Sequence, residues 1–192
     1  MKPLLTVVAF LFSAATLHAA DVNVKPSADG GLIDISASAF VVADVDSAWR
    51  VLTDYDRYSE FLPDLHVSRV RERTAAGAVV EQRGDARFLF LRQPIEVTFA
   101  VTESAPRSVR SVAMRGSFRE FEGRYDLVPV AGGVRFTYTG RLVPGDAIPA
   151  WLTAVALKRN VEQHFRGLAA EMARQAEYRR LAHEHQTAPL SN

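Results

Sequence analysis

The chain has 192 residues, and its 23 basic residues almost balance its 22 acidic ones. This length suits one domain with a substantial core, and the absence of cysteine excludes disulfides, a thiol nucleophile and a thiolate metal site. No block of like charge stands out, so the basic stripe that nucleic-acid binding requires is missing and no nucleic-acid partner is expected.

Residues 1–20 have the composition of a secretory signal peptide. Lys2 supplies a basic start, an apolar run follows, and small residues precede Asp21. The run is shorter than the roughly 20 residues that span a bilayer, and no later apolar run is long enough for a membrane segment. We expect cleavage at Ala19 or Ala20 and a periplasmic or secreted protein with a formal net charge of zero. An uncleaved membrane anchor is the alternative.

The next segments predict an arm, a strand and a helical region. Residues 21–32 are polar and form an expected N-terminal arm, and residues 33–42 are rich in β-branched and small residues, which favours a strand. Asp44 or Asp46 can cap the following helix. Apolar residues then recur on one helical face, at Val45, Ala48, Trp49, Leu52 and Tyr55. A short second helical turn is expected to end at Pro63.

Residues 65–142 mostly have the pattern of strands. Apolar and polar residues alternate in 95–102, 120–127 and 134–142, which predicts an antiparallel sheet with one buried and one solvated face. The sequence Arg92-Gln93-Pro94 predicts a break between strands. Some glycines within the strands suit bulges or sharp bends, namely Gly84, Gly116, Gly123 and Gly140.

The last element is a long amphipathic helix. Pro149 suits its first turn, and apolar residues recur at spacings of three or four, at Leu157, Val161, Phe165, Leu168 and Met172. The helical pattern continues to Leu181, a length of roughly 45–50 Å. Because this exceeds the width of a typical sheet, the part after Tyr178 is expected to project or fray, and residues 179–192 are expected to form a polar tail.

Three segments carry a family resemblance, AWRVLTDYDRYSEFLPDL, GSFREFEGRYDLVP and IPAWLTAVALKRNVEQHFRGLAAEM. Together with the strands between them they cover about residues 33–175. The sequence resembles the START-like polyketide cyclase/dehydrase superfamily, including its coenzyme Q-binding START branch. This resemblance implies an α+β helix-grip domain over residues 33–178. In that fold a curved antiparallel sheet of about seven strands wraps around a long C-terminal helix, and two short helices follow the first strand.

The resemblance also implies a cavity for an apolar small molecule such as a lipid, a quinone or a polyketide. The alternative is a filled hydrophobic core, since protein interiors are usually close-packed. The residues expected to line a cavity are mostly aromatic, namely Phe61, Leu62, Phe88, Phe90, Phe99, Phe121, Tyr125, Tyr138, Trp151, Val155 and Phe165. Tyr125 and Tyr138 could orient a ligand through their hydroxyls, and Gln82 and Arg110 are further polar candidates. The expected function is that of a monomeric carrier.

A cyclase or dehydratase activity on a bound carbonyl compound is the alternative function. It would use Tyr125, Tyr138 or a histidine as acid or base, with His66 and His164 as the histidine candidates. No catalytic motif is present, so no catalytic residue, cofactor or metal site is predicted. The sequence at 183–185 has metal-ligand spacing but falls in the expected tail. A ribosome-associated role, known for some cytosolic relatives, is disfavoured by the leader and the zero net charge.

Overall fold

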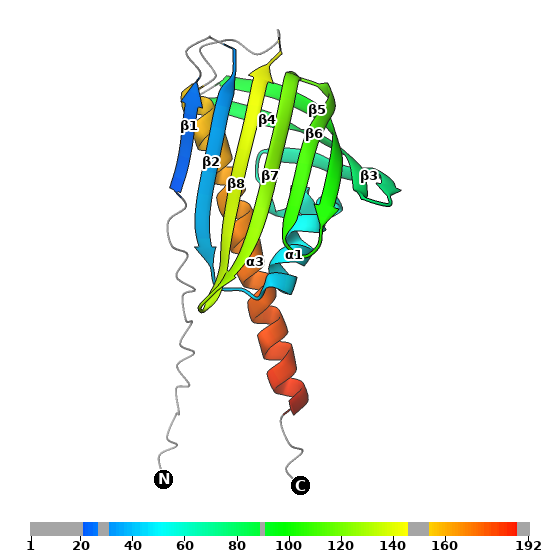
Figure 1. Cartoon of the computed structure of the whole chain (residues 1–192), viewed down its shortest axis with the longest axis vertical. Coiled ribbons are helices and arrows are strands. Elements are labelled where there is room, and N and C mark those ends of the chain that lie inside the picture. Colours follow the sequence, from blue (N-terminus) through cyan, green and yellow to red (C-terminus); the bar gives the residue numbers. More distant parts are fainter. Residues whose placement is uncertain (1–20, 27–30, 89–90, 146–153, 188–192) are drawn as a thin grey trace, which may run out of the picture.

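The computed structural model describes residues 21–26, 31–88, 91–145 and 154–187, and these form a curved sheet around one long helix (Figure 1). The strands are β1 (Asp21–Pro26), β2 (Ile33–Val41), β3 (Leu65–Thr74), β4 (Gly77–Phe88), β5 (Leu91–Ser104), β6 (Ser108–Gly116), β7 (Phe118–Val130) and β8 (Gly133–Pro144). The helices are α1 (Val45–Thr53), the 3₁₀ turn η1 (Tyr55–Arg57), α2 (Tyr58–Phe61) and α3 (Ala154–Thr187).

The eight strands form one sheet in the order β1-β2-β8-β7-β6-β5-β4-β3, with every neighbouring pair antiparallel. The chain is therefore an α+β helix-grip protein, and the predicted fold class is confirmed. Figure 1 shows the strands β3 to β5 passing behind α3, while β2, β8 and β7 lie on its other side. Because the sheet bends and the helix is straight, the two enclose the space in which the site is found.

The alternation along the strands sets which face of the sheet meets α3. In β2 the alternate residues, Ile33, Ile35, Ala37, Ala39 and Val41, are all buried. On α3, buried residues follow the predicted helical spacing at Phe165, Leu168 and Met172. The shared core therefore lies between the inner face of the sheet and one side of the helix, as period-2 and period-3.6 patterns require.

Helix α1 closes one end of this core. Asp44 is its cap, because its carboxylate accepts hydrogen bonds from the Ser47 backbone N–H at 2.8 Å and from the Ser47 hydroxyl at 2.6 Å. The Tyr58 hydroxyl donates to the Leu52 carbonyl at 2.7 Å, which ties α2 to α1. Arg179 on α3 donates to the Ser47 hydroxyl at 3.0 Å, so α1 also contacts the long helix.

Two boundaries differ from the sequence expectation at the ends of the domain. The expected N-terminal arm contains the edge strand β1, whose pairing with β2 runs from Asp21↔Ser38 to Pro26↔Ile33. Backbone pairing at an edge needs no apolar alternation, so the polar sequence did not reveal this strand. Helix α3 continues to Thr187, beyond the predicted end, and Arg180 pairs there with Glu177 and Glu184 at helical spacing.

The predicted break at Arg92-Gln93-Pro94 is also wrong, because Pro94 lies within β5 opposite Asp85 of β4. The pairing of β5 with β6 begins only at Val97. Pro94 is therefore paired with β4 on one side only. Its missing backbone N–H removes no hydrogen bond to β6, because β6 does not reach this part of β5. The predicted helix start at Pro149 lies outside the described residues.

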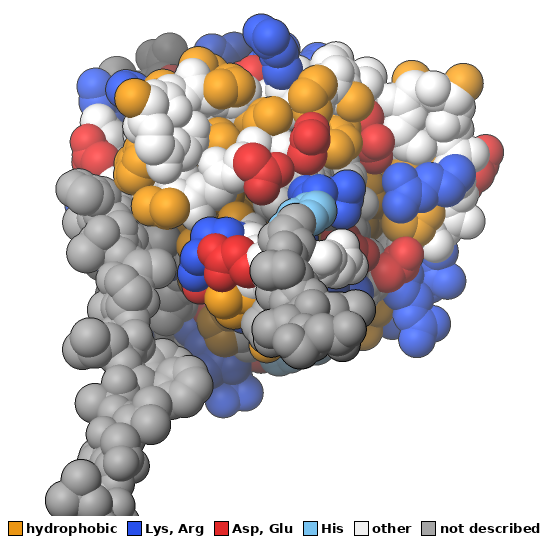
Figure 2. Space-filling model, turned by 90° about the horizontal axis from the view of Figure 1, so that it is seen from below, with side chains coloured by type: hydrophobic (Ala, Val, Ile, Leu, Met, Phe, Trp, Pro, Cys, Tyr) orange, Lys and Arg blue, Asp and Glu red, His pale blue; other side chains and the backbone are white. Residues whose placement is uncertain are grey.

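Beyond its contact with α1, α3 extends past the end of the sheet (Figure 1). Figure 2 views the molecule from this end and shows basic, acidic and hydrophobic side chains interspersed on that face. Among the described helices, none has the length and apolar character needed to span a bilayer.

Candidate functional site

A cavity of about 290 Å³ lies between the inner face of the sheet and α3. Its wall is built by β2, the η1–α2 segment, β3 to β8 and α3. Most of the lining residues are apolar, and the larger ones include Ile35, Leu62, Leu65, Ile95, Phe99, Phe118, Phe121, Leu142, Leu157 and Phe165. A concave, mainly apolar space with a few polar groups is the usual form of a small-molecule site.

Aromatic rings make up much of the sheet side of this wall. Phe121 lies between Phe99 and Phe118, with ring centroids at 5.1 and 5.5 Å. A second group stacks under α3, where Phe136 packs on Phe165 at 4.3 Å and on Tyr125 at 5.4 Å. These contacts hold the rings in place, because stacked and tilted aromatic pairs are favourable in buried environments.

Tyr138 lies flat on the sheet because two glycines face each other beneath it. Gly123 and Gly140 are partners in the β7–β8 register. A Cβ at Gly123 would stand 2.7 Å from the Tyr138 hydroxyl oxygen, and one at Gly140 would collide with the same hydroxyl. The glycines predicted at sheet bends are therefore needed here for space, since a side chain at either position would push the ring into the cavity.

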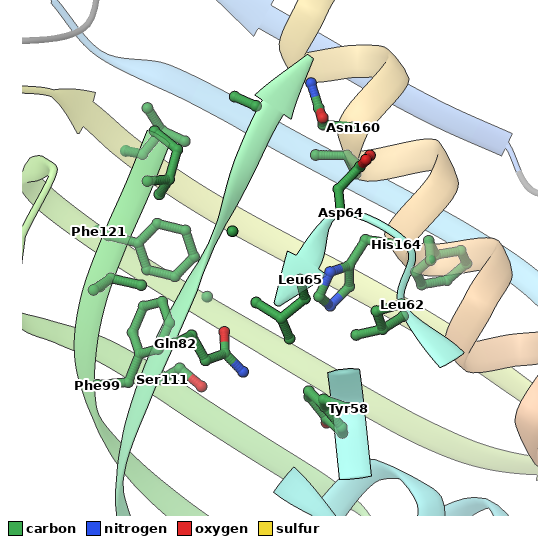
Figure 3. A pocket seen from close by; sticks show the side chains of 18 of the residues that line it. Tyr58, Leu62, Asp64, Leu65, Gln82, Phe99, Ser111, Phe121, Asn160 and His164 are labelled. Carbon is green, nitrogen blue, oxygen red and sulfur yellow. The ribbon is translucent and has the colours of Figure 1, made fainter. Parts of the chain in front are cut away.

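The polar groups of the lining come from opposite sides. Figure 3 shows the Gln82 amide on β4 and the His164 imidazole on α3, both directed toward the interior. The Gln82 amide donates to the Ser68 hydroxyl at 3.3 Å. Ser111, Tyr125 and Tyr138 add hydroxyl groups to the lining. The cavity can thus hold an apolar body and offer hydrogen bonds to a polar group on it.

His164 meets the edge of the Tyr58 ring, with centroids 6.3 Å apart. No carboxylate partner of this imidazole is found among the described residues. Burial lowers the pKa of His164 to about 4, so the ring is neutral at physiological pH. Burial likewise raises the pKa of the Tyr125 and Tyr138 hydroxyls above their usual range. The interior groups are therefore uncharged donors and acceptors.

The mouth of the cavity is marked by exposed Pro63 and by the partly exposed Asp64 and Asp85. Polar contacts join the elements around it. Asp64 forms an ion pair with Arg87 at 2.7 Å. The Asn160 side chain on α3 accepts from the Arg87 backbone N–H at 3.2 Å and donates to its carbonyl at 3.3 Å. The mouth is therefore held by contacts that water can replace.

The sequence matches, over residues 33–177, the family model described as polyketide cyclase/dehydrase and lipid transport. The chain belongs to this family. No curated protein matches it. The family match covers the sheet from β2 onward, the cavity and most of α3.

Solved structures share this fold at low identity. A STAR-related lipid transfer protein from Xanthomonas axonopodis superposes with a TM-score of 0.66 and 20% identity, covering 82% of this chain and 97% of the other. The Zhui aromatase/cyclase from Streptomyces sp. R1128 gives 0.63 and 16%, with 77% and 95% coverage. Human STARD10 gives 0.65 and 10%, with 88% and 77% coverage. At these identities the likeness shows the fold alone.

Six of the residues predicted to line a cavity do so, namely Leu62, Phe99, Phe121, Tyr125, Tyr138 and Phe165. Phe61 is instead partly buried beside Tyr58, with ring centroids 5.6 Å apart, and is not among the lining residues. Phe90 and Trp151 lie outside the described residues, and so do the side chains of Phe88 and Val155. Ligand binding by any of these residues stays a prediction.

Of the polar residues that the sequence analysis selected, some line the cavity and others do not. Gln82 and His164 line the cavity, whereas Arg110 is exposed on the outer face and pairs with Glu122 at 2.7 Å. His66 is half exposed and lies 3.0 Å from Asp85. Sequence reasoning did not select Ser111 or Asn160, because a lone polar residue on a strand or helix has no local signal of facing a cavity. Within the described residues, no group of three potential metal ligands occurs.

Proposed function

We propose that this protein is a carrier that holds an apolar small molecule, such as a lipid, a quinone or a polyketide-like compound, in the cavity between the sheet and α3. The single observation that supports this most directly is the space itself, about 290 Å³ and bounded mainly by apolar and aromatic side chains. Membership in a family described by both cyclase/dehydrase and lipid transport functions is consistent with it.

Native mass spectrometry of the protein purified from its own cells tests this proposal. We expect a bound mass that denaturation releases. The Val97→Phe variant places a ring in the lining and should lose that mass, since Val97 is buried on the cavity wall. Met114→Phe is the matched control, because Met114 is 61% exposed. A protein that is always empty and that also fails to bind an environment-sensitive apolar dye would contradict the proposal.

We further propose that the carrier is exported to the periplasm or secreted. Supporting this is the signal-peptide composition of residues 1–20, with a basic start, an apolar run and small residues before Asp21. Cell fractionation followed by N-terminal sequencing tests it. A mature N-terminus at Ala20 or Asp21 is expected. Recovery of the full-length chain in the cytosol would contradict it.

A cyclase or dehydratase activity is the second candidate, and the position of His164 on the cavity wall favours it. With a pKa near 4 and no carboxylate partner among the described residues, this imidazole is a weak base, which is why we place the carrier first. Incubation with a poly-β-ketone and detection of water loss distinguishes the two. Turnover that His164→Gln abolishes would establish the enzyme; binding without turnover would support the carrier.

A further inference from the structure

Within the part of the chain that the structure describes, the charged residues that line the cavity lie at its mouth. Among the described lining residues, the side chains that carry a formal charge at neutral pH are Asp64 and Asp85. Both already have cationic neighbours, since Arg87 lies 2.7 Å from Asp64 and Arg92 lies 3.8 Å from Asp85. No lysine or arginine is among the described lining residues, and the sequences of 89–90 and 146–153 contain neither.

An anionic ligand group inside this cavity would therefore have no cation to pair with. Moving a carboxylate or phosphate out of water without such a partner is strongly unfavourable. At the mouth, Arg87 and Arg92 are already paired with Asp64 and Asp85, and neither arginine is among the described lining residues. His164 does not compensate, because the interior environment keeps its imidazole neutral.

The interior does, however, contain neutral hydrogen-bonding groups on two facing sides (Figure 3). The carbonyl of Gln82 can accept a hydrogen bond, and its amide has one N–H beyond the one given to Ser68. Ser111 adds a hydroxyl from β6. On α3, a neutral His164 has one donor and one acceptor nitrogen. The side chains of Gln82, Ser111 and His164 form no further hydrogen bond within the described residues.

From these observations we infer that the cavity selects uncharged amphiphiles, with a hydroxyl, ketone or ester group directed at Gln82, Ser111 and His164, over carboxylate or phosphate amphiphiles of the same length. This inference rests on the proposed carrier function and names the ligand class of the same site. The apolar body would lie against Phe99 and Phe121, which face this space in Figure 3.

Displacement of a neutral apolar dye by 1-dodecanol and by dodecanoate tests the selection at about pH 8, where the carboxyl group is ionised. We expect dodecanol to displace the dye at a concentration at least about tenfold lower. Dodecanol is also more hydrophobic than dodecanoate, so a difference between the two ligands does not by itself show selection by the polar groups. The deciding comparison is therefore the binding of dodecanol to the parent protein and to variants. Gln82→Leu and His164→Leu should each weaken dodecanol binding about three- to tenfold more than they weaken dye binding.

Two substitutions of the same kind outside the cavity are the matched controls. Gln93→Leu and His183→Leu should leave dodecanol binding as in the parent protein, since neither residue lines the cavity. Dodecanoate binding as tightly as dodecanol, or dodecanol affinity unchanged in both cavity variants, would overturn the inference while leaving the carrier intact. Failure of the dye and of both amphiphiles to bind would remove the carrier function and the inference together.

Discussion

Helix α3 is held against the sheet by different means at two places. Around Phe165, which is 1% exposed, stacked rings and aliphatic side chains exclude water. One turn or so earlier, Asn160 holds the backbone of Arg87 through two hydrogen bonds next to the Arg87–Asp64 ion pair. Apolar burial is lost only when the packing itself opens, whereas water can replace polar contacts locally. We therefore expect the Phe165 region to hold the fold and the Asn160 region to open more easily.

Truncation of Phe165, at the apolar contact between α3 and the sheet, should cause the largest loss of stability. Phe165→Ala removes a ring that stacks on Phe136 at 4.3 Å and leaves a void beneath the helix. We expect the free energy of unfolding to fall by about 3–5 kcal/mol, measured by urea denaturation. Phe165→Leu, which keeps most of the volume, should lose much less. A loss below about 1 kcal/mol for the alanine variant would show that this region does not hold the helix.

A methyl group added at one of the paired glycines should lower the stability less than Phe165→Ala does. It should also weaken ligand binding in the cavity. In Gly140→Ala the new methyl collides with the Tyr138 hydroxyl, so the ring must turn into the cavity. We expect a loss of about 1–3 kcal/mol from overpacking and weaker binding of an apolar dye. Adding Tyr138→Leu to this variant should restore dye binding. Unchanged binding in Gly140→Ala would mean that Tyr138 does not limit the cavity.

The pH dependence of stability should report the environment of His164. Its folded pKa of about 4 lies below the ordinary value of 6.5, so the unfolded state binds more protons between these two values. The stabilisation is complete above about pH 6.5 and declines as the pH falls toward 4. The contribution lost between about pH 7 and pH 5 is about 2 kcal/mol. Urea denaturation should show this loss in the parent protein and a smaller one in His164→Leu; equal slopes would contradict the assignment.

The smallest loss of stability is expected at the mouth. Asn160→Ala leaves the Arg87 backbone without its side-chain partner, but water can reach these groups. We expect a loss of about 1 kcal/mol together with several-fold faster release of a bound dye, followed by stopped-flow fluorescence. Asn160→Asp keeps an acceptor but not the donor and should be intermediate. Release rates that match the parent protein would place the opening elsewhere.

Several features of this fold could be predicted because they depend on neighbours in the chain. Asp44 at the start of α1 has the local geometry of a cap, and the spacing that ends at Met172 identifies the buried side of α3. The strand β1 could not be predicted in this way, because its pairing is a backbone contact with β2. Pro94 led to a wrong prediction of a strand break for a related reason. A proline is accepted at this position of β5 because the pairing with β6 begins only at Val97.

Alternation and helical spacing are local properties, so the sequence predicted the order of the elements from β2 onward and their buried faces, and its family resemblance implied the helix-grip fold. The tertiary structure was needed to show that the space between sheet and helix stays open, since this depends on how a bent sheet meets a straight helix. It also decided that His164, next to Phe165 in the sequence, lines the cavity with Gln82 and Ser111. Those three residues come from α3, β4 and β6, and no local pattern relates them.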